Sequence, residues 1–201
     1  MSPRRADPEL ARRRREALIK AGFAEILEKG IQATTLDSVV ARAESSKGGA
    51  LYYFRTKDDL LYAVLEWLLA QLDHTLDQVA QAQQSPRVRL ASELEVLFHS
   101  TEVNRKLYVV LFDFIALSLR SERFKSLLNA FFKRCRERDV AIMKEGIEQH
   151  QFRPVRPEDV ALAIRALVDG YCLHWLLSGS QENLEDYRDR CRAVLGAYLL
   201  R

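Results

Sequence analysis

The feature that most constrains the fold of this 201-residue chain is a run of apolar residues spaced three and four positions apart between residues 57 and 80. Side chains at this spacing share one face of an α-helix, because the helix turns once every 3.6 residues. A helix over this run would be a rod of roughly 35 Å. Its apolar stripe consists of Leu60, Leu61, Val64, Leu65, Leu68, Leu72, Leu76 and Val79. Because glycine and proline are few and long strand-like alternations are absent, the sequence predicts an all-α chain of about nine helices.

The other helices are predicted from the same period and from residues that begin or end helices. Gly30 is expected to end the first helix in a left-handed conformation. The residues expected to cap the N-termini of later helices are Thr34 (answered by Asp37), Ser46, Thr56 and Ser85 (followed by Pro86). The predicted helices cover about residues 8–29, two short segments between 34 and 54, and then 56–80, 86–101, 104–119, 121–149, 158–178 and 183–200.

Composition argues against several classes of protein. Cys135, Cys172 and Cys191 are odd in number and widely spaced, so neither a disulfide scaffold nor a zinc site is indicated, and no cofactor or metal is expected. The phosphate-binding loop, the zinc-protease motif and the serine-hydrolase elbow are all absent, so no enzyme is expected. No uncharged apolar run reaches about 18 residues and the N-terminus has no signal-peptide pattern, which favours a cytoplasmic chain without membrane contact.

Charge is divided unevenly along the chain. Residues 1–57 hold twelve Lys or Arg against seven Asp or Glu, whereas the remaining 144 residues hold nineteen against twenty-one. A basic first quarter attached to a slightly acidic remainder suggests that the N-terminal part meets a polyanion. A solvated basic tail is the alternative, because the four consecutive residues from Arg12 to Arg15 cannot all share one helix face.

Two short helices joined by a three-residue turn, behind a longer basic helix, form a helix-turn-helix. The second short helix begins with Ser46, Lys47, Gly48 and Gly49. Unpaired backbone N–H groups at such a start attract phosphate. Glycine costs about 1 kcal/mol against alanine inside a helix, so two in succession indicate close approach of the backbone to another surface. The sequence therefore predicts that this helix contacts DNA.

The stretch from Thr34 to Leu60, TTLDSVVARAESSKGGALYYFRTKDDL, resembles the DNA-binding region of TetR-family transcriptional regulators. The match runs with intact spacing through Thr34, Thr35, Ser46, Lys47, Gly48, Gly49, Leu51, Tyr52, Phe54, Lys57 and Leu60. Glu44, Ser45 and Tyr53 depart from the family pattern, which has Gly, an apolar residue and His at these places. A Glu in a left-handed turn costs about 1 kcal/mol, so the turn could be built differently here.

The resemblance implies a DNA-binding domain over residues 1–56 and a ligand-binding and dimerisation domain over residues 57–201. It implies that Thr35, Tyr52 and Lys57 position phosphates and that Thr34 mainly caps a helix. Base edges in the major groove would be faced by Ser45, Ser46, Lys47 and Gly48. The full set of candidate DNA-binding residues is Thr34, Thr35, Ser45, Ser46, Lys47, Gly48, Gly49, Tyr52, Tyr53 and Lys57.

The C-terminal part, from Phe152 to Trp175, resembles the betaine-responsive repressor subgroup of the same family. This resemblance implies a homodimer in which the last two helices of each protomer form a four-helix bundle. The residues expected at the seam, meaning the contact between the two protomers, are Leu162, Leu167, Leu176, Leu195, Tyr198 and Leu199. A seam and an intramolecular core use the same apolar pattern, so sequence does not separate them.

An effector cavity would be lined by aromatic residues from the middle helices. The candidates are Trp67, Phe98, Tyr108, Phe112, Phe131, Tyr171, His174 and Trp175. The alternative for each of them is that it fills the core.

The sequence thus predicts a ligand-responsive DNA-binding regulator. We expect a homodimeric repressor that is released from a pseudo-palindromic double-stranded operator by a small hydrophobic or amphipathic effector. A helical protein that senses a small molecule and acts through a protein partner is the first alternative. A helical enzyme acting on a lipid is the second, and the lack of converging carboxylates counts against it.

Overall fold

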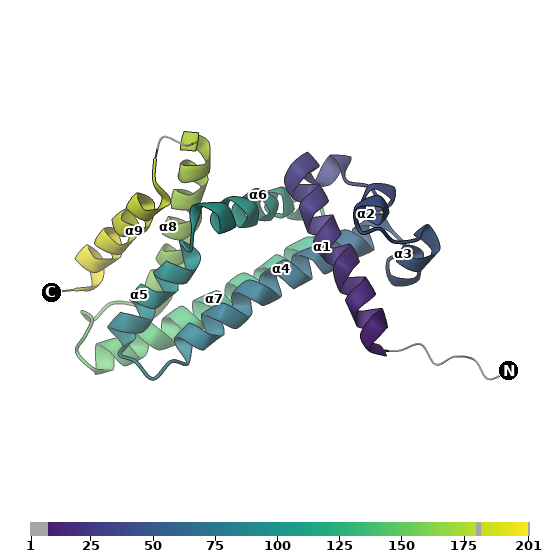
Figure 1. The fold of residues 1–201 in the computed structure, drawn as a ribbon. Helices are drawn as coiled ribbons and strands as arrows, with labels where there is room; N and C mark the ends of the chain where they lie inside the picture. Colours follow the sequence, from purple (N-terminus) through teal and green to yellow (C-terminus); the bar gives the residue numbers. More distant parts are fainter. Residues whose placement is uncertain (1–7, 180–181, 201) are drawn as a thin grey trace. The chain divides into compact units, whose positions relative to one another are not determined.

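The computed structural model describes residues 8–179 and 182–200, and these residues form nine helices and no strand (Figure 1). The prediction of an all-α chain is therefore confirmed. The helices are α1 (Pro8–Ala33), α2 (Leu36–Arg42), α3 (Lys47–Tyr53), α4 (Lys57–Ala80), α5 (Pro86–Leu97), α6 (Thr101–Ser118), α7 (Glu122–Glu148), α8 (Pro157–Ser178) and α9 (Leu184–Leu199).

The chain divides into two compact units. The N-terminal unit consists of the described parts of Met1–Leu69 together with Val109–Phe124, and the C-terminal unit of the described parts of Ala70–Tyr108 and Lys125–Arg201. The sequence predicts a different kind of boundary, at residue 56, between residues that bind DNA and residues that bind an effector. That functional boundary stays a prediction.

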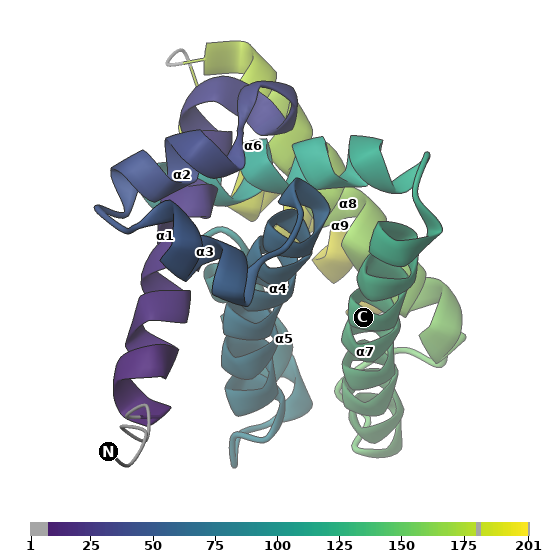
Figure 2. The ribbon, with the colours of Figure 1, turned by 90° about the vertical axis from the view of Figure 1, so that its right-hand side faces the viewer.

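The N-terminal unit is organised around a break near the end of α1. Gly30 has φ +76°, as expected for a residue that interrupts this helix, and a side chain there would be strained. The backbone N–H of Ile31, freed by the break, donates to Oδ2 of Asp113 in α6 at 3.2 Å. Ile31 is buried, so the break turns the chain back onto the core of the unit. Figures 1 and 2 show α2 and α3 beside α1 as a result.

A buried carboxylate joins α1 to α2. Glu25 is 2% exposed, and its Oε1 accepts from Nε of Arg42 at 2.6 Å. Its Oε2 accepts from the ammonium group of Lys29 at 3.0 Å. The bond from Arg42 above all, with smaller contributions from Ser38 and Lys29, holds the pKa of Glu25 at about 2 against its ordinary 4.5, although burial acts in the opposite direction. Arg42 also pairs with Glu28 at the surface, so one guanidinium group fixes α2 to two turns of α1.

The caps around α2 differ from the prediction at one residue. Thr35, and not Thr34, is the N-cap: its hydroxyl accepts from the N–H of Ser38 at 3.0 Å, and the Ser38 hydroxyl accepts from the N–H of Thr35 at 3.1 Å. Ser38 therefore forms the reciprocal hydrogen bond of the capping box, a role that was predicted for Asp37. Thr34 is fully buried and donates its hydroxyl to the carbonyl of Gly30 at 2.9 Å, so this hydroxyl is not available as the cap of α2. The predicted caps Ser46, Thr56 and Ser85 are confirmed.

The corner between α5 and α6 falls earlier than predicted. α5 ends at Leu97 rather than near residue 101. The side chain of Asn104 takes the place of the backbone hydrogen bonds that a longer α5 would make at this end. The side chain of Asn104 donates to the carbonyl of Leu97 at 2.7 Å and accepts from the N–H of Ser100 at 3.3 Å. Asn104 is itself 1% exposed, so the corner is held from inside the C-terminal unit.

α8 and α9 lie side by side in both ribbon views (Figures 1 and 2). Two of the predicted seam residues, Leu195 and Leu199, are 3% and 1% exposed and therefore belong to the core of this unit. They were misassigned because core and seam share one helical period. The large apolar side chains that remain exposed on these two helices are Leu162, Leu173, Leu177, Val194 and Tyr198.

Among the described residues, α8 alone is long and apolar enough, by length and composition, to cross a membrane. It also carries Arg165, which is 6% exposed and paired with Asp169, and it is covered along one face by α9. These features are those of a core helix packed against protein.

Gly146 in α7 sits against the ring of Phe152, which follows the helix and is 4% exposed. A Cβ at this position would come within 2.1 Å of the Phe152 ring. We expect Gly146→Ala to lower the free energy of unfolding by about 1–3 kcal/mol, the range for overpacking a core, as measured by chemical denaturation. In Gly196→Ala the added Cβ would lie 3.8 Å from its nearest neighbour. An equal loss in both variants would contradict the steric reason.

Candidate nucleic-acid interface

The turn between α2 and α3 is built on Glu44, which has φ +49°. Glu44 therefore adopts the left-handed conformation, at a cost of about 1 kcal/mol, and the turn is not built differently as the sequence had suggested. The N–H of Ser45 donates to the carbonyl of Val40 at 3.1 Å, and this bond closes the turn. The Glu44 side chain is exposed, so it adds a negative charge at the edge of a surface that is otherwise basic or polar.

The start of α3 presents backbone and small side chains to solvent. Ser46 is the N-cap, and its hydroxyl accepts from the N–H of Gly49 at 3.1 Å. Lys47 is exposed, and its ammonium group lies 2.9 Å from Oδ1 of Asp37 in α2. An exposed pair of this kind is worth at most about 1 kcal/mol, so the ammonium group stays available to a phosphate.

The two glycines of α3 have different surroundings. A Cβ on Gly49 would lie 2.9 Å from the hydroxyl of Ser46, so the helix cap itself favours Gly there. A Cβ on Gly48 would have nothing within 4 Å. The prediction of close approach to another surface therefore applies to Gly48, because no described residue is near enough to require the absence of a side chain there.

Aromatic groups follow on the same helix. Tyr52 is 79% exposed, and its ring meets that of Tyr53 edge-on at 5.0 Å between centroids. Leu51, also in α3, is 43% exposed. Lys57 begins α4 and donates to the backbone carbonyl of Gln32 at 3.0 Å. This bond holds the base of α4 to the end of α1, so Lys57 already has a role within the fold.

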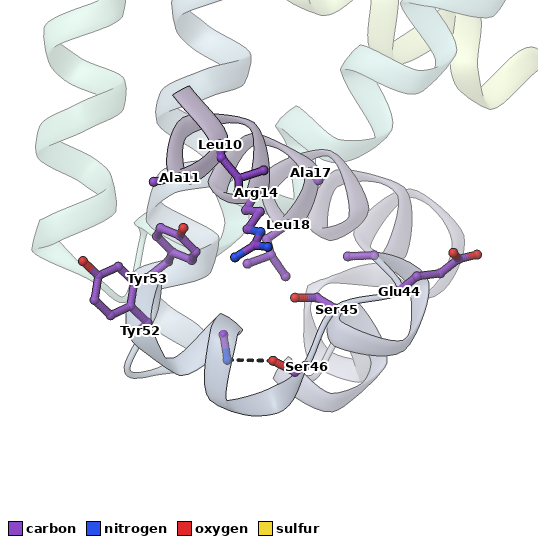
Figure 3. A pocket seen from close by; sticks show the side chains of 12 residues that line it. Leu10, Ala11, Arg14, Ala17, Leu18, Glu44, Ser45, Ser46, Tyr52 and Tyr53 are labelled. Atoms are coloured by element: carbon purple, nitrogen blue, oxygen red, sulfur yellow. Dashed lines mark hydrogen bonds between the residues drawn. The ribbon is translucent and has the colours of Figure 1, made fainter. Parts of the chain in front are cut away.

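A hollow of about 530 Å³ separates the first half of α1 from the α2–α3 turn and α3 (Figure 3). In the view of Figure 3, the guanidinium group of Arg14 points into this hollow, with Tyr53 on one side and Ser45 on the other. The lining residues are Leu10, Ala11, Arg14, Ala17, Leu18, Ala43, Glu44, Ser45, Ser46, Gly49, Tyr52 and Tyr53. The hollow therefore joins a cation, hydroxyl groups and phenol groups on one open surface.

Arg14 is the candidate residue that sequence reasoning missed. Within the run of four arginines, Arg12 and Arg13 both donate to the carboxylate of Glu9. Arg14 stands four residues from Leu10 and four from Leu18, so it shares their helix face. That spacing was a usable signal, but treating the arginines as one run concealed it.

The predicted DNA-binding residues are brought together in part. Five of them, Ser45, Ser46, Gly49, Tyr52 and Tyr53, line the hollow. Lys47 and Gly48 lie beside it at the exposed start of α3, and Thr35 is exposed at the start of α2. Thr34 is buried and does not reach this surface.

The eight candidate effector-binding residues are divided between the two units, and their role stays a prediction. Trp67 and Phe112 belong to the N-terminal unit, where the Trp67 ring packs on Phe23 at 5.7 Å. In the C-terminal unit His174 is exposed, and the Tyr171 ring packs on Tyr187 at 6.0 Å. The remaining candidates, each 1% exposed, are Phe98, Tyr108, Phe131 and Trp175. A hollow of about 220 Å³ between α5 and α9 is lined by none of the eight.

The three cysteines are buried and unpaired. Burial raises the pKa of Cys135 to about 11 and those of Cys172 and Cys191 to about 12, so their reactive thiolate forms are scarce at neutral pH. Within the described ranges no group of three or more His, Cys, Asp or Glu side chains is arranged to hold a metal ion.

Comparison with known proteins places this geometry in context. Residues 18–64 match the model of bacterial regulatory proteins of the tetR family, and residues 86–200 match that of the BetI-type transcriptional repressor C-terminal domain. The chain is 30% identical over 175 residues to the HTH-type transcriptional regulator BetI of Burkholderia thailandensis, a match that covers 86% of this chain and 87% of the relative.

Two solved structures have the same fold. A TetR transcription regulator from Haloarcula marismortui superposes with a TM-score of 0.85 at 24% identity, covering 94% of this chain and 99% of that one. A protein from Saccharomonospora viridis, determined in complex with choline, superposes with a TM-score of 0.88 at 16% identity, again covering 94% and 99%.

Proposed function

This chain belongs to the TetR family of DNA-binding transcriptional regulators, in its BetI repressor type, and on this premise we propose that it is a homodimeric repressor released from DNA by a small effector. It acts in the cytoplasm, on double-stranded DNA. Residues 1–56 bind the operator, and residues 57–201 bind the effector and dimerise.

The observation that carries the DNA-binding part is the exposed start of α3. Gly48 leaves open space at this start, because no described atom would lie within 4 Å of a Cβ there. Lys47 and Tyr52 offer an ammonium group and a phenol group on the same helix. A helix presented in this way enters the major groove, where its first residues meet base edges. Arg14 and the hydroxyl-lined hollow accept backbone phosphates of the same duplex.

The operator is a pseudo-palindrome because the repressor has twofold symmetry. Exposed apolar side chains on α8 and α9 are what two protomers bury together: Leu162, Leu173, Leu177, Val194 and Tyr198. The two copies of α3 then read half-sites about 34–36 Å apart or somewhat more.

The effector is a small hydrophobic or amphipathic molecule held in the C-terminal domain. It binds a conformation in which the two copies of α3 are spaced wrongly for the operator, so effector and DNA compete by linkage. A difference in affinity of about 100-fold between the two conformations, near 2.7 kcal/mol, suffices for release.

Selection of duplexes from a random pool by the purified protein tests this function. An enriched palindrome, bound less tightly as salt rises, is the expected result. Small hydrophobic and amphipathic compounds are then screened for release of the enriched duplex. If no duplex is enriched at moderate salt, the proposal is wrong, and a sensor acting through a protein partner takes its place.

Arg14→Ala is expected to weaken binding of the enriched duplex by about 5- to 10-fold and to reduce the slope of log K against log salt by about 1, because one phosphate contact is lost. Fluorescence anisotropy over a salt series measures both. Arg12→Ala serves as the control, because Arg12 lies in the same helix but does not line the hollow. Equal slopes in the Arg14 variant and the wild type would exclude the phosphate contact.

A further inference from the structure

Leu51 is an apolar residue of the helix-turn-helix motif that the fold leaves largely uncovered. Its neighbour Ala50 is 2% exposed and packs in the core of the N-terminal unit, whereas Leu51 is 43% exposed. Leu51 is part of the matched motif but not of the set of candidate DNA-binding residues. A single exposed leucine is common on protein surfaces, so the surroundings of this one decide whether it has a function.

Leu51 lines a hollow of about 160 Å³ between α2 and α3. The other lining residues are Leu36, Asp37, Val40, Lys47 and Ala50. This hollow shares no residue with the one that Arg14 lines. Two hollows therefore border α3, one with hydroxyl and phenol groups in its lining and the other with mainly apolar side chains.

Leu51 shares a face of α3 with Gly48 and Tyr52. Residues three and four positions apart in a helix lie on one face, so Leu51 and Tyr52 both follow Gly48 by one turn. All three residues are exposed. Gly48 lets the backbone of α3 come close to another surface, because it has no side chain there and no described neighbour requires this. A surface that approaches Gly48 closely therefore also meets Leu51.

The major groove offers few partners for a leucine side chain. Base edges there present hydrogen-bond donors and acceptors, and the C5-methyl group of thymine is the apolar group among them. A leucine side chain can neither donate nor accept a hydrogen bond. Placed against the polar edge of another base, it would remove water from donors and acceptors without replacing the lost bonds, which is unfavourable. The thymine methyl group is therefore the complementary partner.

We infer that Leu51 recognises the C5-methyl group of one thymine in each operator half-site. The inference rests on the proposed function, in which α3 enters the major groove of a pseudo-palindromic operator. The methyl group packs on Leu51 at the rim of the apolar hollow, beside the bases that Gly48 approaches. Because this contact neutralises no phosphate, its contribution to affinity does not depend on salt.

The test uses the full chain and the duplex selected from the random pool. Deoxyuridine replaces thymidine at one position at a time, in both half-sites together, so that only methyl groups are removed. At one position we expect binding to weaken about 15-fold, because burying a methyl group contributes about 4-fold in each half-site. Fluorescence anisotropy at constant salt measures the change. If no thymine responds, the inference is overturned.

Leu51→Ala is expected to bind the thymidine and deoxyuridine duplexes with affinities within about twofold of each other, because the side chain that meets the methyl group is gone. Its salt slope stays that of the wild type. Leu119→Ala is the matched control, since Leu119 is an exposed leucine of the same unit, and it keeps the full response. A full response in Leu51→Ala, or a reduced salt slope, would contradict the methyl contact.

Leu51→Gln provides a second, independent variant. Its side chain presents an amide, which pairs with N6 and N7 of adenine. When the selection is repeated with this variant, we expect thymine to be lost at the responsive position and adenine to be favoured. Continued enrichment of thymine there would overturn the inference even if Leu51→Ala failed to fold.

The selection itself separates this inference from the proposed function. A protein that selects a palindrome but binds its thymidine and deoxyuridine forms equally contradicts only the role of Leu51. A protein that selects no duplex contradicts the proposed repressor itself.

Discussion

Gly48→Leu is expected to fold as well as the wild-type protein and to bind operator DNA at least about 100-fold more weakly. Gly48 is exposed and a Cβ there has no neighbour within 4 Å among the described residues, so the helix has room for a side chain at this position. Replacing a helical glycine stabilises α3 by up to about 1 kcal/mol. On DNA, the same side chain would push the start of α3 away from the groove and so weaken several contacts at once. A 100-fold loss corresponds to about 2.7 kcal/mol.

Anisotropy titrations with the selected duplex and thermal unfolding of the free protein measure the two effects separately. Ala41→Leu is the matched control, because it adds the same side chain at an exposed position on α2 of the same unit. It is expected to keep operator affinity within about threefold. Operator affinity retained by Gly48→Leu would mean that the start of α3 does not approach DNA.

The helices could be predicted from sequence because their signals are local. Apolar periodicity located α4, and the caps Ser46, Thr56 and Ser85 stood where a hydroxyl precedes a helical run. Thr34 and Thr35 are equally good caps in sequence terms. The choice between them depends on the break at Gly30, whose carbonyl takes the Thr34 hydroxyl, and on the burial of Thr34. That is a tertiary effect, which local propensity does not contain.

The candidate site was predictable where a spaced motif carries it and not elsewhere. The motif in and around α3 identified Lys47, Gly48 and Tyr52, but it contains no information on α1. Arg14 joins that surface only because α1 and α3 face each other across a hollow. Leu195 and Leu199 show the converse failure, in which a clear pattern did not distinguish two kinds of burial.

The second large effect is expected on stability and concerns the contact between α1 and α2. Arg42→Ala removes the main partner of the buried Glu25 carboxylate and leaves it with Lys29 and Ser38, and it is expected to lower the free energy of unfolding by about 2–3 kcal/mol at pH 7. Lys20→Ala, which removes an exposed ion pair with Glu16, is expected to cost about 0.5 kcal/mol or less. Chemical denaturation of the wild type and both variants gives the three values.

The pH dependence of that loss identifies its cause. The pKa of Glu25 is about 2 in the folded protein and 4.5 ordinarily, so the contribution of its ionised form is complete above about pH 4.5 and is lost as the pH falls toward 2. In Arg42→Ala the main cause of the low pKa is gone while burial remains, so the pKa of Glu25 rises. The difference in stability between wild type and Arg42→Ala is therefore expected to be constant between pH 6 and 8 and to shrink steadily below about pH 4.5. A difference that stays constant down to pH 3 would mean that lost packing of the Arg42 side chain, and not its bond to Glu25, holds α2 against α1.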